Sequence, residues 1–220
     1  MTGKRNYDDG CAMAHALDLV GERWALLVVR ELLFGPRRFS DLRGSLPGIS
    51  PNVLSQRLKD LEEIGVLRRS QLAPPAAAWV YGLTEWGREL EPILQQLGRW
   101  GARSPAHDPA KPISLSTVLS AQKTMFDPEQ AGAFEGTLAL HLGREDYVVT
   151  VKDGQLDLQP GSTKAADVDV TTSVTALGAA IFGGVPISEL ESAGQMTVQG
   201  ASELFQRYVT FFPLPEKAEG

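Results

Sequence analysis

Two pairs of adjacent arginines flank a polar segment, and this arrangement could bind a phosphate backbone. Arg37 and Arg38 precede the segment, and Arg68 and Arg69 follow it. Guanidinium groups bind phosphate oxygens through a planar fork of N–H donors. Between the two pairs lie side chains that can hydrogen-bond base edges or phosphates, namely Ser40, Ser50, Asn52, Ser55, Gln56, Arg57 and Lys59. These residue types indicate non-covalent binding of a nucleic acid.

The same stretch predicts two short helices followed by a hairpin. The first helix covers residues 39–46 and ends at Pro47-Gly48. Ser50 is a favourable N-cap and Pro51 suits a first helical position, so a second helix covers 51–64. Leucines mark the core side of this second helix. Because successive side chains are rotated by 100° around a helix, the side opposite the leucines carries Asn52, Ser55, Gln56 and Lys59. Arg57 lies between these two sides. With strands at 66–70 and 79–83, the order is that of a winged helix-turn-helix, which lays one helix in the major groove of double-stranded DNA.

Helices on both sides complete a mainly α N-terminal domain. Apolar residues at three- and four-residue spacing predict one helix that ends near Gly35, through Leu17, Val20, Trp24, Leu27, Val28 and Leu32. Thr84 is placed to cap a last helix over 85–100, whose apolar positions are Leu90, Ile93, Leu94 and Leu97.

The charge of the chain is unevenly divided. The net charge of the 220 residues is −6. Residues 1–110 contain 14 Lys/Arg and 13 Asp/Glu, whereas residues 111–220 contain 7 and 14. Exposed charges act over only about 10 Å at moderate salt, so local basic charge decides phosphate affinity. We therefore expect DNA at the N-terminal half and not at the acidic C-terminal half.

The composition predicts a multidomain chain. Three prolines, Pro105, Pro109 and Pro112, interrupt any helix after residue 102,. We expect a DNA-binding and dimerisation domain over 1–102, a linker over 103–113 and a second domain over 114–220. Apolar residues alternate along 138–142, 147–151, 156–158 and 168–170, and Asp153-Gly154 predicts a hairpin turn. We also expect helices near 114–125, 173–183 and 201–212 and a strand near 195–199. The second domain is therefore predicted to be α+β.

Several kinds of chemistry are not expected. Cys11 is the single cysteine, so no disulfide framework is formed. His15, His107 and His141 lie far apart in the sequence, with no metal-ligand spacing and no partner for a nucleophile. No apolar run approaches the about 20 residues that span a bilayer, and acids stand where a signal peptide is apolar. We expect a cytoplasmic protein that is not an enzyme, with no cofactor, no metal and no membrane partner.

The N-terminal half resembles a known family. The motifs W-x-L-L-x-x-R-E-L, G-P-x-R-F-S-D-L, P-G-I-S and Y-x-L-T-x-x-G, all between Cys11 and Trp100, are similar to those of the HxlR family of bacterial transcription regulators. The resemblance implies a homodimer joined through the first and last helices of the domain and bound to a palindromic operator. Trp100 and the stripe of Leu90, Leu94 and Leu97 would then be dimer contacts, and the alternative is that they belong to the core of one subunit. It also implies a candidate redox sensor at Cys11, although this chain has Cys11-Ala12 where the family usually has Cys-Pro. Asp8 and Asp9 would disfavour a reactive thiolate there.

The C-terminal half, from about residue 115 to 213, resembles the sterol carrier protein domain. The pattern consists of three strands, a small helix before a Gly-Gly turn, a strand from Gly194 to Gly200 and a closing apolar helix. It implies a sheet covered by helices around a site for a hydrophobic small molecule. The residues that we expect at such a site are Leu177, Ile181, Phe182, Leu204, Phe205, Tyr208, Phe211 and Phe212. The same residue types would also line an ordinary core, in a domain that serves as a spacer or dimerisation module.

Two functions follow from these interpretations. The first is a homodimeric transcription regulator, more plausibly a repressor, whose second domain senses a hydrophobic effector. The alternative is a protein that binds or carries lipids or other hydrophobic ligands, in which the winged helix serves dimerisation or protein contact. The distribution of arginines favours the regulator.

Overall fold

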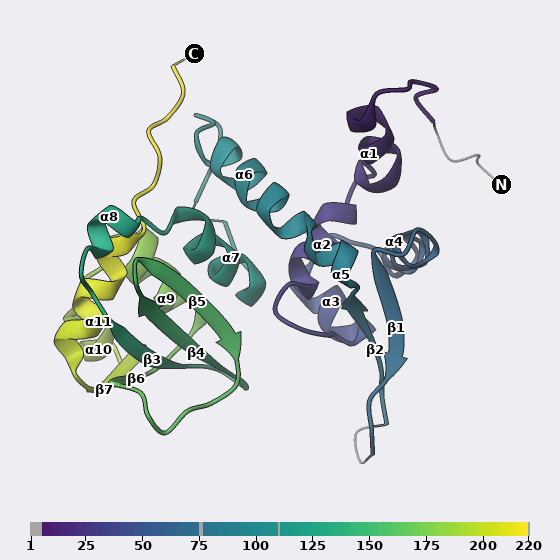
Figure 1. The fold of residues 1–220 in the computed structure, drawn as a ribbon. Coiled ribbons are helices and arrows are strands. Elements are labelled where there is room, and N and C mark those ends of the chain that lie inside the picture. The colour runs from purple at the N-terminus through teal and green to yellow at the C-terminus, as the bar shows by residue number, and fades with distance from the viewer. Residues whose placement is uncertain (1–5, 75–76, 110, 220) are drawn as a thin grey trace. The chain divides into compact units, whose positions relative to one another are not determined.

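The computed structural model describes residues 6–74, 77–109 and 111–219. The chain divides into two compact units, one ending at Leu94 and the other beginning at Gln95. Each unit has its own sheet and its own buried core (Figure 1). Helix α6, Leu90–Ala102, contains the position at which the units divide.

The first unit is a winged helix-turn-helix. Its elements are α1 (Ala12–Val20), α2 (Ala25–Leu32), α3 (Phe39–Ser45), α4 (Pro51–Glu63), β1 (Leu67–Gln71), β2 (Trp79–Leu83) and α5 (Glu85–Arg88), followed by α6. The predicted helices at 39–46 and 51–64 and the predicted hairpin strands are therefore confirmed. As predicted, Ser50 Oγ accepts a hydrogen bond from the Val53 amide at 3.3 Å, and Pro51 starts α4.

The prediction of one helix from Leu17 to Leu32 is wrong. The chain forms α1 and α2, separated by Gly21–Trp24, and Trp24 has a left-handed φ of +79°. A residue in that conformation cannot continue a right-handed helix. Trp24 nevertheless packs against the core of the unit, which explains why the apolar spacing runs on across the break.

The predicted helix over 85–100 is also divided, into α5 and α6. Thr84 caps α5 as expected, because its Oγ1 accepts from the Gly87 amide at 3.0 Å. The same hydroxyl donates to the carbonyl oxygen of Gly65 at 2.7 Å. A Cβ at position 87 would lie 2.0 Å from the Val66 oxygen, so glycine is required for this close approach of α5 to the start of the wing.

The second unit is a five-stranded sheet with helices, the α+β fold expected. The strand order is β5-β4-β3-β6-β7, in which β3 and β6 are parallel and the other neighbours are antiparallel. The strands are β3 (Gly136–Leu142), β4 (Glu145–Lys152), β5 (Gln155–Pro160), β6 (Val168–Thr172) and β7 (Met196–Gly200). Asp153 and Gly154 both have positive φ, at 52° and 67°, as a two-residue hairpin turn between β4 and β5 requires,.

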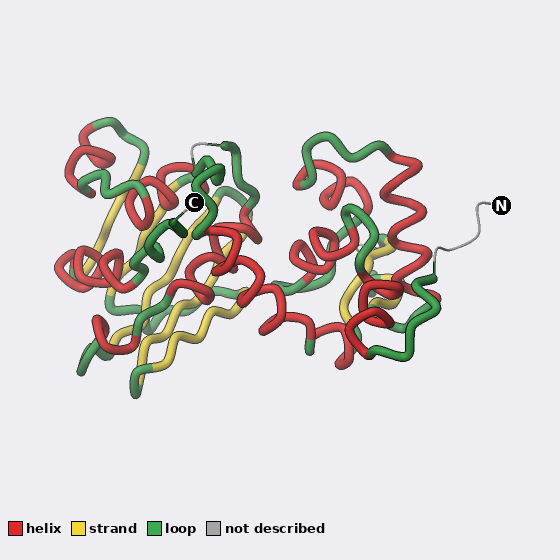
Figure 2. Tube along the Cα trace, turned by 90° about the horizontal axis from the view of Figure 1, so that it is seen from above, coloured by secondary structure: helices red, strands yellow, loops and turns green. Residues whose placement is uncertain are grey.

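The helices of the second unit lie beside this sheet (Figure 2). They are α7 (Leu115–Met125), α8 (Pro128–Ala131), α9 (Val174–Phe182), α10 (Ile187–Ser192) and α11 (Ser202–Tyr208), with a 3-10 turn at Val209–Phe211. Helices α8 and α10 were not predicted, since each is shorter than two turns and shows too little periodicity. Strand alternation buries Leu138, Leu140 and Val149 towards the helices, whereas Thr137 and His141 lie on the opposite, partly exposed face.

Candidate nucleic-acid interface and ligand groove

Helix α4 presents a polar face opposite its core side. Leu54, Leu58 and Leu61 are buried. The four residues that the helical period places opposite them are all exposed, namely Asn52, Ser55, Gln56 and Lys59. Asp60 orders part of this face, because it accepts a hydrogen bond from Gln56 Nε2 at 2.7 Å. The face can offer hydrogen bonds to DNA without disturbing the core.

Arg57, expected on the flank of α4, is engaged within its own unit. Its guanidinium lies 3.1 Å from a carboxylate oxygen of Asp60 and 3.8 Å from one of Glu22. The side chain is only 17% exposed. Glu22 belongs to the short segment between α1 and α2, so Arg57 ties α4 to this segment. Its charge is partly neutralised, unlike that of a free arginine.

The other predicted residues before α4 lie on the surface around α3. Arg38 and Ser40 are exposed and Arg37 is half-buried. The backbone of Arg37 exchanges two hydrogen bonds with Tyr81 of β2, at 2.9 and 2.8 Å. This bridge joins the start of α3 to the wing. The hydroxyl of Ser50 is used as the cap of α4.

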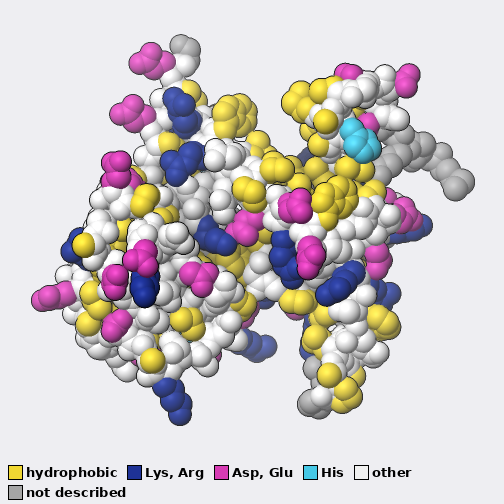
Figure 3. Space-filling model, in the orientation of Figure 1, with side chains coloured by type: hydrophobic (Ala, Val, Ile, Leu, Met, Phe, Trp, Pro, Cys, Tyr) yellow, Lys and Arg dark blue, Asp and Glu magenta, His cyan; other side chains and the backbone are white. Residues whose placement is uncertain are grey.

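The two arginines of the wing lie on opposite faces of β1. Arg68 lines a hollow of about 410 Å³ with Thr84, Trp86 and Arg88. Arg69 lies over the rings of Trp79 and Tyr81 on β2, at 4.4 and 6.0 Å from the ring centroids. Sequence reasoning found both arginines but missed the two aromatic partners. The cross-strand pairing of Arg69 with Tyr81 would have revealed one of them. Figure 3 shows hydrophobic side chains on the visible face of this hairpin.

Apolar side chains remain uncovered on two helices. On α6, Ile93, Leu97 and Trp100 are 56%, 47% and 74% exposed and recur at helical spacing. On α1, Met13 and Leu17 are also exposed. Leu90 and Leu94, by contrast, pack against the core of the first unit. The predicted stripe of α6 therefore divides into a core-facing part and an uncovered part.

Cys11 stands at the N-cap of α1 and is exposed. The amides of Ala14 and Met13 lower the pKa of its thiol below the ordinary value. From the sequence, we expect Asp8 and Asp9 to disfavour the thiolate form of Cys11. Asp9 instead accepts a hydrogen bond from the Cys11 amide at 2.9 Å. A lowered thiol pKa at a helix start favours the reactive thiolate.

The second unit contains an open groove of about 770 Å³. It lies between the end of α9, the start of α10 and the chain around the 3-10 turn, and Leu214 also lines it. Of the eight expected ligand residues, the groove is lined by Ile181, Phe182 and Phe212. The other five do not line it: Leu177, Phe205, Tyr208 and Phe211 are core residues, and Leu204 is half-buried. The hydroxyl of Tyr208 donates to Gln122 Oε1 inside this core, and burial raises the pKa of Tyr208.

His141 has partners that its position in the sequence did not indicate. Its Nδ1 lies 2.8 Å from Asp146 Oδ1, and its Nε2 lies 3.2 Å from Asp169 Oδ1. Strand pairing brings β3, β4 and β6 together and so places both carboxylates beside this ring. Within the described part of the chain, no group of three or more His, Cys, Asp and Glu could hold a metal ion.

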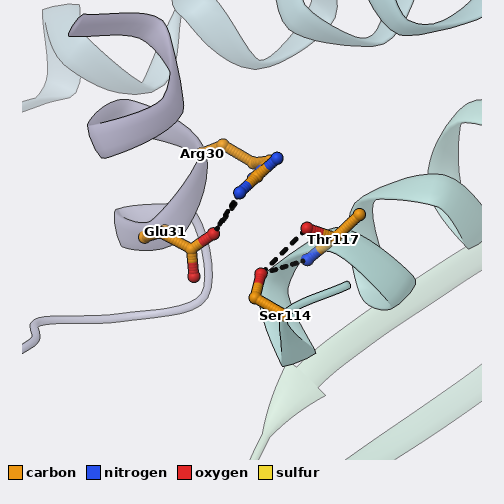
Figure 4. Close-up of polar contacts among 4 residues, drawn as sticks. All are labelled: Arg30, Glu31, Ser114 and Thr117. Atoms are coloured by element: carbon orange, nitrogen blue, oxygen red, sulfur yellow. Dashed lines mark hydrogen bonds and ion pairs between the residues drawn. The ribbon is translucent and has the colours of Figure 1, made fainter. Parts of the chain in front are cut away.

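Figure 4 shows two local polar contacts, one in each unit. In the first unit, the buried carboxylate of Glu31 on α2 pairs with Arg30 Nη2 at 2.6 Å. In the second, Ser114 Oγ accepts from the Thr117 amide at 3.1 Å and caps α7. Among the described residues, no helix is long and apolar enough to cross a membrane.

Two protein families match separate parts of the chain. Residues 19–108 match the HxlR-like helix-turn-helix family, and residues 117–213 match the SCP-2 sterol transfer family. The uncharacterized HTH-type transcriptional regulator YvaP of Bacillus subtilis is 41% identical over 85 residues, which are 39% of this chain and 79% of YvaP. The HTH-type transcriptional regulator YodB of the same organism is 35% identical over 88 residues, covering 40% of this chain and 79% of YodB.

One relative from another organism than B. subtilis and one solved structure also match part of the chain. The uncharacterized HTH-type transcriptional regulator Rv3095 of Mycobacterium tuberculosis is 40% identical over 107 residues, which are 49% of this chain and 67% of that protein. The reduced form of YodB from B. subtilis has a TM-score of 0.40 at 32% identity and covers 44% of this chain and 98% of that chain. This protein therefore belongs to the HxlR-like helix-turn-helix family of transcriptional regulators, and its residues 117–213 match the SCP-2 sterol transfer family.

Proposed function

We propose that this protein is a homodimeric repressor that reads a palindromic operator with α4 and the β1–β2 wing and responds to a hydrophobic effector. It acts by binding and not by catalysis, in the cytoplasm. We assign DNA binding and dimerisation to residues 1–102, a linker to 103–113 and effector binding to 114–220. The observation that carries the proposal is the exposed polar face of α4, flanked by Arg38 and the wing.

The residues divide into two kinds of DNA contact. Asn52 and Gln56 are exposed amides on α4, and amides match adenine edges in the major groove. Arg37, Arg38, Lys59, Arg68 and Arg69 would contact phosphates, which set the position of the protein on the duplex. Arg57 would act indirectly, by holding α4 against Glu22.

The uncovered stripe of α6 supports a dimer. Ile93, Leu97 and Trp100 together leave a large apolar surface in water, and such patches on a small domain typically mark protein contacts. A twofold dimer presents two copies of α4, so its operator would be a palindrome with half-sites about one helical turn apart.

The groove of the second unit supports an effector site. Its volume of about 770 Å³ lies within the range of small-molecule sites. Ile181, Phe182 and Phe212 contribute apolar lining, beside polar residues such as Gln206 and Thr210. An effector can change DNA affinity only by binding two arrangements of the dimer unequally.

Fluorescence anisotropy with DNA would test the proposal. Sequencing of the genomic fragments retained by the purified protein supplies the operator. Asn52→Ala should cost about 1–3 kcal/mol on the operator and little on unrelated duplex, whereas Arg38→Ala should weaken binding to every duplex and lower the salt slope by about 1. Lys152→Ala, at an exposed residue of β4, is the matched control and should change neither.

Two outcomes would contradict the assignment. If Asn52→Ala and Arg38→Ala both bind like the wild type, the DNA surface is elsewhere. If the wild type has no salt-dependent affinity for any duplex, the alternative becomes the better explanation, namely a protein that binds hydrophobic ligands through the groove. Native mass spectrometry of protein purified from its host would then reveal a bound ligand as added mass.

A further inference from the structure

The wing contains very few cations. No Lys or Arg occurs between Arg69 and Arg88 in the sequence, and residues 72–79 carry no charge at all. Adjacent residues of a strand point to opposite faces, so Arg68 and Arg69 cannot serve the same side of the hairpin. On the face that includes Tyr81 and Trp79, Arg69 supplies the positive charge of the wing.

Two aromatic rings determine where this charge lies. Arg69 is directly opposite Tyr81 in the antiparallel pair, and Trp79, opposite Gln71, is the next residue along β2 on the same face. The guanidinium carbon of Arg69 lies 4.4 Å from the Trp79 ring centroid and 6.0 Å from that of Tyr81. A cation over an aromatic face is attracted by the ring quadrupole, most strongly by tryptophan.

The backbone of Arg69 is also held in place. Its amide donates to Glu62 Oε1, near the end of α4, at 3.1 Å. Tyr81 is held in turn by the two backbone hydrogen bonds to Arg37. Arg69 is therefore connected to α4 through Glu62 and to the start of α3 through Tyr81.

The charge of Arg69 stays available for a ligand. Among the residues that the structure describes, no carboxylate pairs with its guanidinium, whereas Arg57 has Asp60 and Glu22. A guanidinium attracted to a ring through its charge keeps its N–H donors, and these can bind the two oxygens of a phosphate. Trp79 itself is 51% exposed, so burial of its ring gives only a partial reason for a tryptophan at this site.

We propose that Trp79 is a positioning residue for DNA binding: its indole holds the Arg69 guanidinium in place to contact a backbone phosphate on the wing side of the operator. The inference rests on the proposed DNA-binding function and adds a residue that the sequence did not indicate. A pre-ordered arginine loses less side-chain entropy on binding, and this is the advantage that Trp79 confers.

A double-mutant cycle with the full chain tests the inference. Binding to the operator duplex and to an unrelated duplex is measured by anisotropy over a series of salt concentrations. Trp79→Ala should weaken binding to both duplexes by about two- to fivefold, the equivalent of one exposed cation–π interaction. In the Arg69→Ala background the same change should have no further effect, since the group that it positions is gone.

Three further variants separate positioning from folding. Trp79→Phe keeps an aromatic face and should retain most of the affinity. Trp79→Leu keeps an apolar side chain without a ring and should bind like Trp79→Ala. Arg68→Ala, on the other face of β1, should combine additively with Trp79→Ala.

Specific outcomes of these binding measurements would contradict the role proposed for Trp79. If Trp79→Ala weakens binding as much in the Arg69→Ala background as in the wild type, Trp79 supports the hairpin and not Arg69. If Trp79→Ala leaves affinity unchanged while Asn52→Ala weakens operator binding, the inference fails and the proposed function stands. A wild type without salt-dependent DNA affinity would overturn both.

Discussion

The ammonium group of Lys217 donates a hydrogen bond of 3.0 Å to the carbonyl oxygen of Ala102, the last residue of α6. A second bond from the same group reaches Ser104 at 3.2 Å. Arg103 adds two contacts, because its Nε donates to Glu216 and its carbonyl oxygen accepts from the Ala218 amide. The C-terminal segment therefore caps the helix that carries Trp100, and Leu214 of the same segment lines the groove.

Lys217→Met should loosen the end of α6. A cation at a helix C-terminus contributes about 0.3–1 kcal/mol, so the amides of residues 99–104 should exchange hydrogen faster in this variant. Mass-detected hydrogen exchange measures the change. Lys164→Met, at an exposed loop position, is the control, and equal exchange in both variants would show that Lys217 does not stabilise α6.

Tyr208→Phe should destabilise the second unit by about 1–3 kcal/mol. The substitution leaves Gln122 Oε1 buried without its donor, and an unsatisfied buried acceptor carries a cost of that size,. Urea denaturation, followed by hydrogen exchange in β3, measures the loss. Adding Gln122→Met should recover part of it, because both polar partners are then gone. Tyr147→Phe, whose hydroxyl donates to the partly exposed Glu145, should cost less.

The stability of the second unit should depend on pH through His141. Hydrogen bonds to Asp146 and Asp169 raise the pKa of His141 above its ordinary 6.5. The protonated form is thus stabilised by folding, so the contribution is full below 6.5 and is lost as pH rises through the folded pKa. The unfolding free energy should fall over that window, and His141→Gln should flatten the profile. An NMR titration midpoint of the ring at or below 6.5 would contradict this.

Cys11 should react faster with alkylating reagents than an unstructured thiol. The amides at the start of α1 lower the pKa of its thiol, and the thiolate is the nucleophile,. Iodoacetamide labelling over a pH series should therefore show a midpoint below that of the same protein unfolded in urea. Cys11→Ser provides the blank. Coincident midpoints for folded and unfolded protein would argue against Cys11 as a sensor.

Much of the fold was predictable because its signals are local. The cap at Ser50, the proline at position 51 and the leucines of α4 determine the helix and its exposed face together. Strand alternation and the Asp153-Gly154 turn likewise define the neighbouring strands β4 and β5. The first predicted helix breaks at Gly21, the C-cap of α1, where glycine is a known stop signal, although the apolar spacing continues across it. The break in the last predicted helix was not predictable, because Glu89 is a good helix former,.

The sequence by itself determined the identity of the exposed polar residues on α4, since one helix and its core side are enough to place them. It also determined the local basic charge on which any phosphate affinity depends. Only the tertiary structure decided which charges remain available. Arg57 is paired with Asp60 and Glu22, while Arg69 lies over the ring of Trp79 and has no acidic partner among the described residues. His141 acquires two aspartates, and Lys217 reaches the end of α6, more than a hundred residues away along the chain. Such contacts depend on strand pairing and chain path over long separations, and no local pattern encodes them.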